Sequence, residues 1–213
     1  MSFQSLRATI LASFVLSVAA FAQNATVDTP FQVRYASNLN IGDSVVNITN
    51  SGAQGAGLNA GTSASTTGAL CVNVYAFSPD EQMISCCSCP VTPNGLVSLS
   101  ARQDLISNTL TPAVPTSIVV KLYATTPIGG SCSNSAAAPG AAAPGMLAFG
   151  TTVHAGAAAG SAAAVTETPF LPATLSAGEL NRLTQLCTFI NATGSGFGIC
   201  RSCRLGGLGA GRL

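Results

Sequence analysis

The stretch Leu70-Cys-Val-Asn-Val-Tyr-Ala-Phe-Ser-Pro-Asp-Glu-Gln-Met-Ile-Ser-Cys-Cys-Ser-Cys89 decides the fold that we expect for this chain. Residues 70–77 alternate between two faces with a period of two, which is typical of a β-strand with one buried face. Ser78 and Pro79 suit the first two positions of a type I turn, after which residues 82–86 can run back as a second strand. We therefore predict an antiparallel hairpin with four cysteines on or beside its strands.

The same period of two recurs along most of the chain. Residues 116–124 show it clearly, because Ile118, Val120 and Leu122 share one face. Further candidate strands are residues 31–36, 44–49, 96–101, 147–154 and 164–170. Eight short strands separated by turn signals predict a mainly β fold, either an antiparallel β-sandwich or a jelly-roll-like domain. The order of the strands is left open.

One amphipathic helix is expected near the C-terminus, packed on the sheet. Ser176 can cap its first turn, and Glu179 can reach back to complete a capping box. Gly194 and Gly196 are placed to end the helix. Spacings of three and four residues give it one apolar stripe, formed by Leu180, Leu183, Cys187 and Ile190.

The first 22 residues have the pattern of a cleavable signal peptide. Arg7 supplies a positive charge ahead of an apolar run over residues 8–19, and Ala20 and Ala22 are the small residues that a signal peptidase reads. The apolar run is too short to span a bilayer, and no second run follows. We expect a protein that is secreted or extracytoplasmic, in the periplasm, at the cell surface or outside the cell, with no transmembrane segment after cleavage.

Cleavage after Ala22 would leave about 191 of the 213 residues, which suits one domain with enough chain for a core. We place this domain at residues 23–204, followed by a flexible Gly-rich tail over residues 205–213. Surface loops rich in Ala, Gly and Pro are expected at residues 52–68, 135–145 and 155–164.

Few residues of the chain are charged. Only 7% are Asp, Glu, Lys or Arg, against about 25% in typical soluble domains. Loss of Arg7 would leave seven basic and seven acidic residues. Because clustered cations are missing, neither nucleic-acid binding nor docking to anionic lipid is expected. Near-zero net charge favours association, so self-association and contacts with envelope or matrix components stay open.

All eight cysteines follow the expected signal peptide, at Cys71, Cys86, Cys87, Cys89, Cys132, Cys187, Cys200 and Cys203. Thiols oxidise in exported proteins, so an even number predicts disulfides, four at most. The hairpin would bring Cys71 opposite residues 87–89, which suggests one local bridge there. A bond between the neighbours Cys86 and Cys87 is not expected.

Metal binding or thiol redox chemistry is the competing interpretation. Cys86, Cys87, Cys89, Cys200 and Cys203 could supply thiolates, and Cys-x-x-Cys is one half of a structural zinc site. Residues 86–89 depart from the usual zinc spacing, however, and residues 200–203 precede a Gly-rich tail instead of opening a helix as in a redox enzyme. Disulfides are therefore the leading prediction, with no metal and no cofactor.

The chain offers little for catalysis, and we predict no enzyme activity. His154 is the only histidine, and its alternation with Phe149 and Val153 puts it on the opposite, solvated face. Among the seven acidic residues, Asp104 and Glu167 remain a pair that could converge as a glycosidase requires. No nucleophile elbow, phosphate-binding loop or dinucleotide fingerprint is present. The predicted function is that of a non-enzymatic structural, surface or interaction protein.

Three blocks of the sequence carry a further likeness. They are CCSCPVTPNG at residues 86–95, LPATLSAGEL at residues 171–180 and CRSCRLGG at residues 200–207. Together they resemble a group of exported, cysteine-rich bacterial proteins, over much of the chain from about Cys71 onward. The resemblance implies export and brings no activity, ligand or catalytic residue with it.

Overall fold

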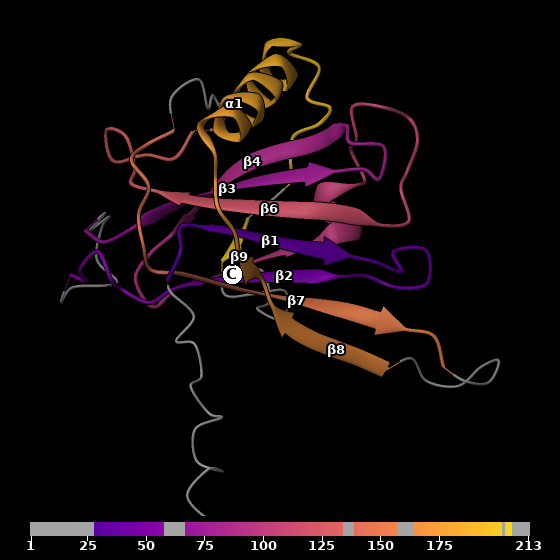
Figure 1. Cartoon of the computed structure of the whole chain (residues 1–213), viewed down its shortest axis with the longest axis horizontal. Coiled ribbons are helices and arrows are strands. Elements are labelled where there is room, and N and C mark those ends of the chain that lie inside the picture. Colours follow the sequence, from indigo (N-terminus) through magenta and orange to yellow (C-terminus); the bar gives the residue numbers. More distant parts are fainter. Residues whose placement is uncertain (1–27, 58–66, 134–138, 157–163, 202, 206–213) are drawn as a thin grey trace, which may run out of the picture.

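The computed structural model describes residues 28–57, 67–133, 139–156, 164–201 and 203–205. Two five-stranded sheets make up its body (Figure 1). The expected signal peptide over residues 1–22 lies outside the described residues, as do residues 206–213 of the expected tail. The same holds for parts of the three predicted loops, at residues 58–66, 134–138 and 157–163.

The first sheet contains the predicted hairpin. Its strands, in order, are β4 (Met83–Val91), β3 (Leu70–Phe77), β6 (Ile118–Thr125), β1 (Phe31–Ala36) and β9 (Leu171–Pro172). The second strand of the hairpin is longer than predicted, because it continues past Cys86 to Val91. Cys87, Cys89 and Val91 alternate into the core and so extend the period of two through the cysteine cluster.

The second sheet holds the strands β10 (Arg204–Leu205), β5 (Leu96–Ser100), β2 (Val45–Asn50), β7 (Met146–His154) and β8 (Ala164–Pro169), in that order. All eight predicted strands are present; β1 and β3 have the predicted ends, and the ends of the other six are shifted. β9 and β10 have two residues each and were not predicted. Leu205, which we expected in the tail, pairs with Val97 of β5.

The main core lies between the two sheets, where alternate side chains of both meet. Val72 and Val74 of β3 and Leu122 of β6 face Ile48 of β2 and Leu99 of β5, and all five are fully buried. The pairs of neighbouring strands are antiparallel throughout both sheets. This arrangement confirms the predicted β-sandwich with a C-terminal helix. Within the described residues, no helix combines the length and apolarity needed to cross a membrane.

The helix α1 (Ala177–Ala192) covers the outer face of the first sheet (Figure 1). Ser176 caps it as predicted, since its Oγ accepts a hydrogen bond from the Glu179 N–H at 3.1 Å. The Glu179 carboxylate does not complete the capping box but binds Lys121 Nζ of β6 at 2.6 Å. The buried face of the helix includes Leu183, Cys187 and Ile190 of the predicted stripe. Both faces of the first sheet are therefore largely buried.

Candidate functional site

All eight cysteines are paired, and the four disulfides confirm the leading prediction. The bonds are Cys71–Cys132, Cys86–Cys187, Cys87–Cys200 and Cys89–Cys203. They join residues 61 to 114 positions apart, so each links distant parts of the fold. No cysteine is left as a thiol.

The alternation of β4 decides which way its cysteines point. Cys86 faces the outer side of the first sheet, where it packs with the α1 residues and bonds to Cys187. Cys87 and Cys89 face the inner core. The expected bridge from Cys71 to residues 87–89 is therefore wrong. Cys71 lies opposite Pro90, on the outer face, and bonds to Cys132 instead.

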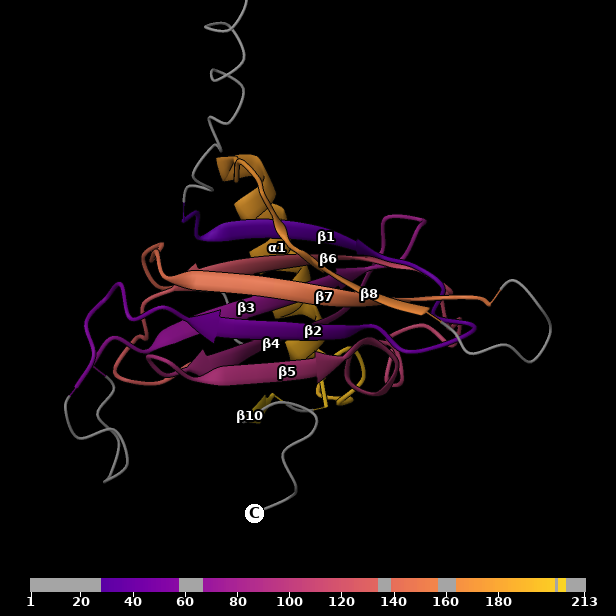
Figure 2. The ribbon, with the colours of Figure 1, turned by 90° about the horizontal axis from the view of Figure 1, so that it is seen from below.

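The segment after α1 closes one side of the sandwich. It runs beside β4, where Cys86 N–H donates to the Gly198 carbonyl at 2.8 Å and Cys200 N–H donates to the Cys86 carbonyl at 3.3 Å. The same segment then forms β10 and pairs with β5 at the edge of the second sheet (Figure 2). A single strap thus joins the edge strands of both sheets, and we call residues 198–205 the C-terminal strap.

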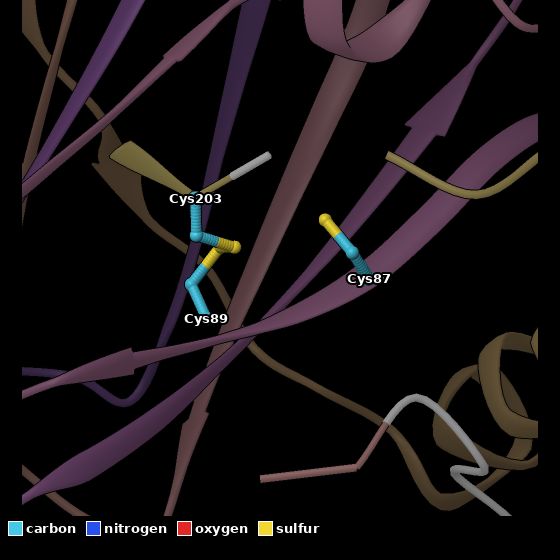
Figure 3. A group of neighbouring side chains, drawn as sticks. All are labelled: Cys87, Cys89 and Cys203. Carbon is cyan, nitrogen blue, oxygen red and sulfur yellow. A yellow bond between two sulfur atoms is a disulfide. The ribbon is translucent and has the colours of Figure 1, made fainter. Parts of the chain in front are cut away.

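Two disulfides hold this strap to the inner face of β4. Sγ atoms of Cys87, Cys89 and Cys203 lie within 4.8 Å of one another (Figure 3). Cys200 completes the group through its bond to Cys87. The structure therefore brings together four of the five cysteines proposed as metal ligands and leaves Cys86 on the other face. As disulfides these sulfurs are not the thiolates that bind zinc, so a metal would require their reduction.

His154 stands at the end of β7, exposed to solvent as predicted. Its Nε2 lies 2.9 Å from the Thr166 hydroxyl on the neighbouring strand β8. The alternation with Phe149 holds, but the faces are the reverse of those that the pattern suggests. Phe149 lies on the outer face with 39% of its surface exposed, while His154 continues the inner row beyond the core.

The two acids proposed as a converging pair are far from each other in the sheet order. Asp104 lies buried in the π-helical turn η1 (Ala101–Leu105), which follows β5, and accepts the Ser100 N–H at 2.7 Å. Glu167 is exposed on β8 and accepts a hydrogen bond from Asn47 at 2.9 Å. Strands β2 and β7 stand between β5 and β8. The structure therefore does not assemble a glycosidase pair from these two residues.

A different pair of acids does converge, on Ser100. Asp43 accepts the Ser100 hydroxyl and the Arg102 N–H, the latter at 3.0 Å, while Asp104 accepts the Ser100 N–H. Both carboxylates thus satisfy donors of the η1 turn, which gives them a structural role. Sequence reasoning missed this pair because the two acids are 61 positions apart in the chain, which hides their proximity.

Sequence reasoning also missed a groove on the side of the sandwich opposite the strap. It has a volume of about 630 Å³ and is lined by β1, β7, β8 and β9. Arg34 of β1 is among its lining residues although only 9% of its surface is exposed. Burial lowers the pKa of Arg34, and the nearby Glu167 carboxylate opposes this effect. The one available signal was an arginine in alternation with apolar residues along residues 31–36.

Similarity to known proteins is a second source of functional information. Here it adds none, so the function must be inferred from the residues and their arrangement. The chain matches no family model, no curated protein and no solved structure.

Proposed function

We propose that this chain is an extracytoplasmic, non-enzymatic protein with a structural, surface or interaction role. The observation that carries the proposal is the pairing of every cysteine, with two disulfides holding the C-terminal strap across the edges of both sheets. Disulfides of this kind persist in oxidising compartments such as the periplasm or the extracellular space. The resemblance to exported bacterial proteins supports the same compartment.

The disulfide framework suits a protein that must keep its shape outside the cell. In the chain-entropy model, closing loops of the observed 61 to 114 residues stabilises the fold by about 4–5 kcal/mol per bond. The contributions are not additive, because the strap carries two bonds that restrain the same segment. The sparse charge of the chain also favours contacts with neutral polymers, envelope components or further copies over contacts with polyanions.

Export and oxidation are tested together by expressing the full chain with its own N-terminus and isolating the mature protein. The intact mass is expected to correspond to cleavage after Ala22 and to be about 8 Da below that of the reduced chain, because each disulfide removes two hydrogens. Alkylation before reduction should label no cysteine. Eight alkylated thiols in the exported protein would overturn the proposal.

A second candidate function is metal binding or thiol redox chemistry, and the clustered sulfurs of Cys87, Cys89 and Cys203 favour it. Reduction of Cys87–Cys200 and Cys89–Cys203 by a dithiol would release four thiols beside β4. Four thiolates are a ligand set that zinc accepts in structural sites. In this function the strap would be held by the metal in place of the two disulfides.

Cobalt titration of the anaerobically reduced protein tests the second candidate. A tetrathiolate site gives intense visible absorption at one equivalent of cobalt, and a Cys86→Ser variant should keep it because Cys86 faces α1. A Cys89→Ser variant should lose it. This candidate is excluded if the reduced wild-type protein binds no cobalt and if, in the oxidised protein, Cys87–Cys200 and Cys89–Cys203 react with dithiol no faster than Cys71–Cys132.

A further inference from the structure

The groove opposite the strap forms where one strand changes sheets. The chain leaves β8 in the second sheet, passes the buried Phe170 and enters β9 in the first sheet. β9 pairs with β1 only at Gln32 and Val33. Beyond this point β1 and β8 diverge, as Figure 1 shows on the side where the β7–β8 pair extends away from β1. The space between them is the groove, which we call the β1–β8 wedge.

β1 presents an open backbone edge to this wedge. The Phe31 carbonyl accepts a hydrogen bond from Ala173 N–H at 3.1 Å, so alternate residues of β1 direct their backbone groups toward β9. Tyr35 belongs to the same row but lies beyond the two residues that β9 pairs. Its backbone N–H and carbonyl therefore point toward the wedge, and no strand in the described part of the chain pairs with them.

β8 contributes a second open edge. The Phe170 N–H donates to the Ala148 carbonyl of β7 at 2.8 Å, which assigns the even-numbered row to β7. Val165 and Glu167, in the odd-numbered row, direct their backbone groups away from β7. Unpaired strand edges of this kind accept an added strand from another chain.

A buried cation lies at the floor of the wedge. The Arg34 guanidinium donates to the Thr152 hydroxyl at 2.9 Å and to the Thr151 carbonyl at 3.2 Å, and it has longer contacts to the hydroxyls of Ser44 and Thr168. All of these acceptors are neutral. In the described part of the chain, no carboxylate lies within ion-pair distance of this guanidinium. The ion pair found among the described residues is formed by two other side chains, Lys121 and Glu179.

Gly150 shows that the space for Arg34 is built into the second sheet. A Cβ atom at this position would lie 2.2 Å from Arg34 Nη1. Any other residue would therefore push the guanidinium out of its place. The absence of a side chain on β7 at this point lets a charged group reach the interior from the opposite sheet.

The walls of the wedge are mainly apolar. The apolar lining residues include Val33, Pro169, Leu171, Pro172 and Ala173. Leu171 is 68% exposed and Tyr35 is 60% exposed, so both are available to a ligand. A volume of about 630 Å³ is in the range of ordinary ligand sites.

We propose that the β1–β8 wedge binds the C-terminal end of an extended, apolar peptide. Its backbone adds to the edge of β1 at Tyr35, and its terminal carboxylate meets the guanidinium of Arg34. The carboxylate supplies the counterion that the buried cation lacks, and charge-assisted contacts of this kind are stronger than those to neutral acceptors. A small organic acid would use the cation alone and leave both strand edges unpaired.

This inference goes beyond the proposed function, because it assigns a ligand class to a site that the disulfides do not touch. The C-terminal strap lies against β4 and β5, whereas the wedge lies at the other end of both sheets. The site can therefore fail its test while export and disulfide formation are confirmed.

The test uses three probes on the oxidised, ¹⁵N-labelled protein, read by amide chemical shifts. They are N-acetyl-Ala-Val-Phe with a free carboxylate, the same tripeptide as its C-terminal amide, and 4-phenylbutyrate. We expect the peptide acid to shift the Tyr35 amide and the amides of Val165 and Glu167 in a saturable way. The peptide amide should bind at least about tenfold more weakly, because it lacks the charge. 4-Phenylbutyrate should leave the Tyr35 amide unshifted.

Two variants distinguish the effect of the Arg34 charge on binding from an effect on folding. Glu167→Gln removes the exposed acid whose field reaches Arg34, and it should tighten binding of the peptide acid about two- to threefold at low salt without changing that of the amide. Arg34→Gln should abolish the preference for acid over amide. Arg182→Gln is the matched control, since it removes one exposed positive charge on α1 and should leave the preference intact. If Arg34→Gln does not fold, the Glu167→Gln variant still tests the role of the Arg34 charge, through its expected effect on binding of the peptide acid but not of the amide.

Each contrary result overturns the proposal. Equal binding of acid and amide removes the role of Arg34, and 4-phenylbutyrate binding as tightly as the peptide removes the role of the strand edges. Shifts confined to residues outside the wedge place the ligand elsewhere. Shifts at Tyr35 that follow protein concentration without peptide mean that a second copy of the chain occupies the wedge.

Discussion

Cys86 on the outer face of β4 is bonded to Cys187 in the middle of α1, with their Cα atoms 5.9 Å apart. This disulfide attaches the helix covalently to the sheet that it covers. Around it, Tyr75 and Phe77 of β3 and Leu183 and Ile190 of α1 form a second core, separate from the one between the sheets.

Replacing both partners, as Cys86→Ala with Cys187→Ala, should lower the free energy of unfolding by about 2–5 kcal/mol. Urea denaturation measures the loss. Amide hydrogen exchange in α1 should also become faster, because the helix then keeps only non-covalent contacts with the sheet, such as side-chain packing and the Lys121–Glu179 ion pair. The control is Cys71→Ala with Cys132→Ala, which removes a disulfide away from the helix. Equally fast α1 exchange in both double variants would contradict this account.

Lys121 and Glu179 form the ion pair between β6 and α1, and both side chains are about three-quarters buried, with exposures of 22% and 24%. Glu179→Gln should lower the free energy of unfolding by up to about 1 kcal/mol, since water still screens the pair. The wild-type protein should lose this difference at high salt. Thermal unfolding at low and high salt measures it, with Glu81→Gln in the exposed turn as control. A deficit that persists in high salt would point to packing rather than charge.

Much of the β-sandwich could be predicted because its signals are local. Ser176 caps α1 through a hydrogen bond within one turn, and the turn at Ser78 and Pro79 joins β3 to β4. Which row of β1 side chains points into the core between the sheets could not be predicted in the same way. Phe31 alternates with Arg34, but both sides of the first sheet are covered, so burial of the apolar row under α1 leaves the arginine facing inward. A period of two identifies a strand but cannot say which of two buried faces is the inner one.

The disulfide pairing and the two-residue strands depend on contacts between distant parts of the chain. Cys89 and Cys203 are 114 positions apart, and no local pattern relates them. β9 and β10 are too short to show any period. β9 is placed by its pairing with β1 and β10 by its pairing with β5, and sequence alone predicts neither pairing.

Tyr75 lies fully buried beneath α1, and its hydroxyl has no hydrogen-bond partner among the described residues. Tyr75→Phe should therefore leave the free energy of unfolding unchanged at neutral pH or raise it by about 1 kcal/mol. Tyr35→Phe on the exposed edge of β1 is the matched control. Denaturant titration distinguishes the cases. A loss above about 1 kcal/mol in Tyr75→Phe would mean that the hydroxyl makes a bond in solution.

Alkaline pH should affect the same residue. Burial, with a smaller contribution from the neighbouring Tyr123, raises the pKa of Tyr75. A raised pKa means that the folded state favours the neutral phenol, so this stabilisation is complete below the unfolded-state value of about 10 and is lost as the pH rises through the folded-state value. As the pH rises above about 10, the wild-type protein should therefore lose stability more steeply than Tyr75→Phe. Parallel curves for the two proteins would show that the phenol stays hydrated.

Gly150 and Gly178 should respond in opposite ways to the same substitution. Gly150→Ala forces a Cβ into the Arg34 guanidinium at 2.2 Å, and overpacking of this kind costs about 1–3 kcal/mol. Gly178 lies in the first turn of α1, where an added Cβ would meet nothing closer than Ser176 Oγ at 4.0 Å. Gly178→Ala should raise the free energy of unfolding by up to about 1 kcal/mol, because alanine restricts the unfolded chain and favours helix. Urea denaturation of the two variants measures both effects. Gly150→Ala with wild-type stability would mean that Arg34 can leave the interior at little cost.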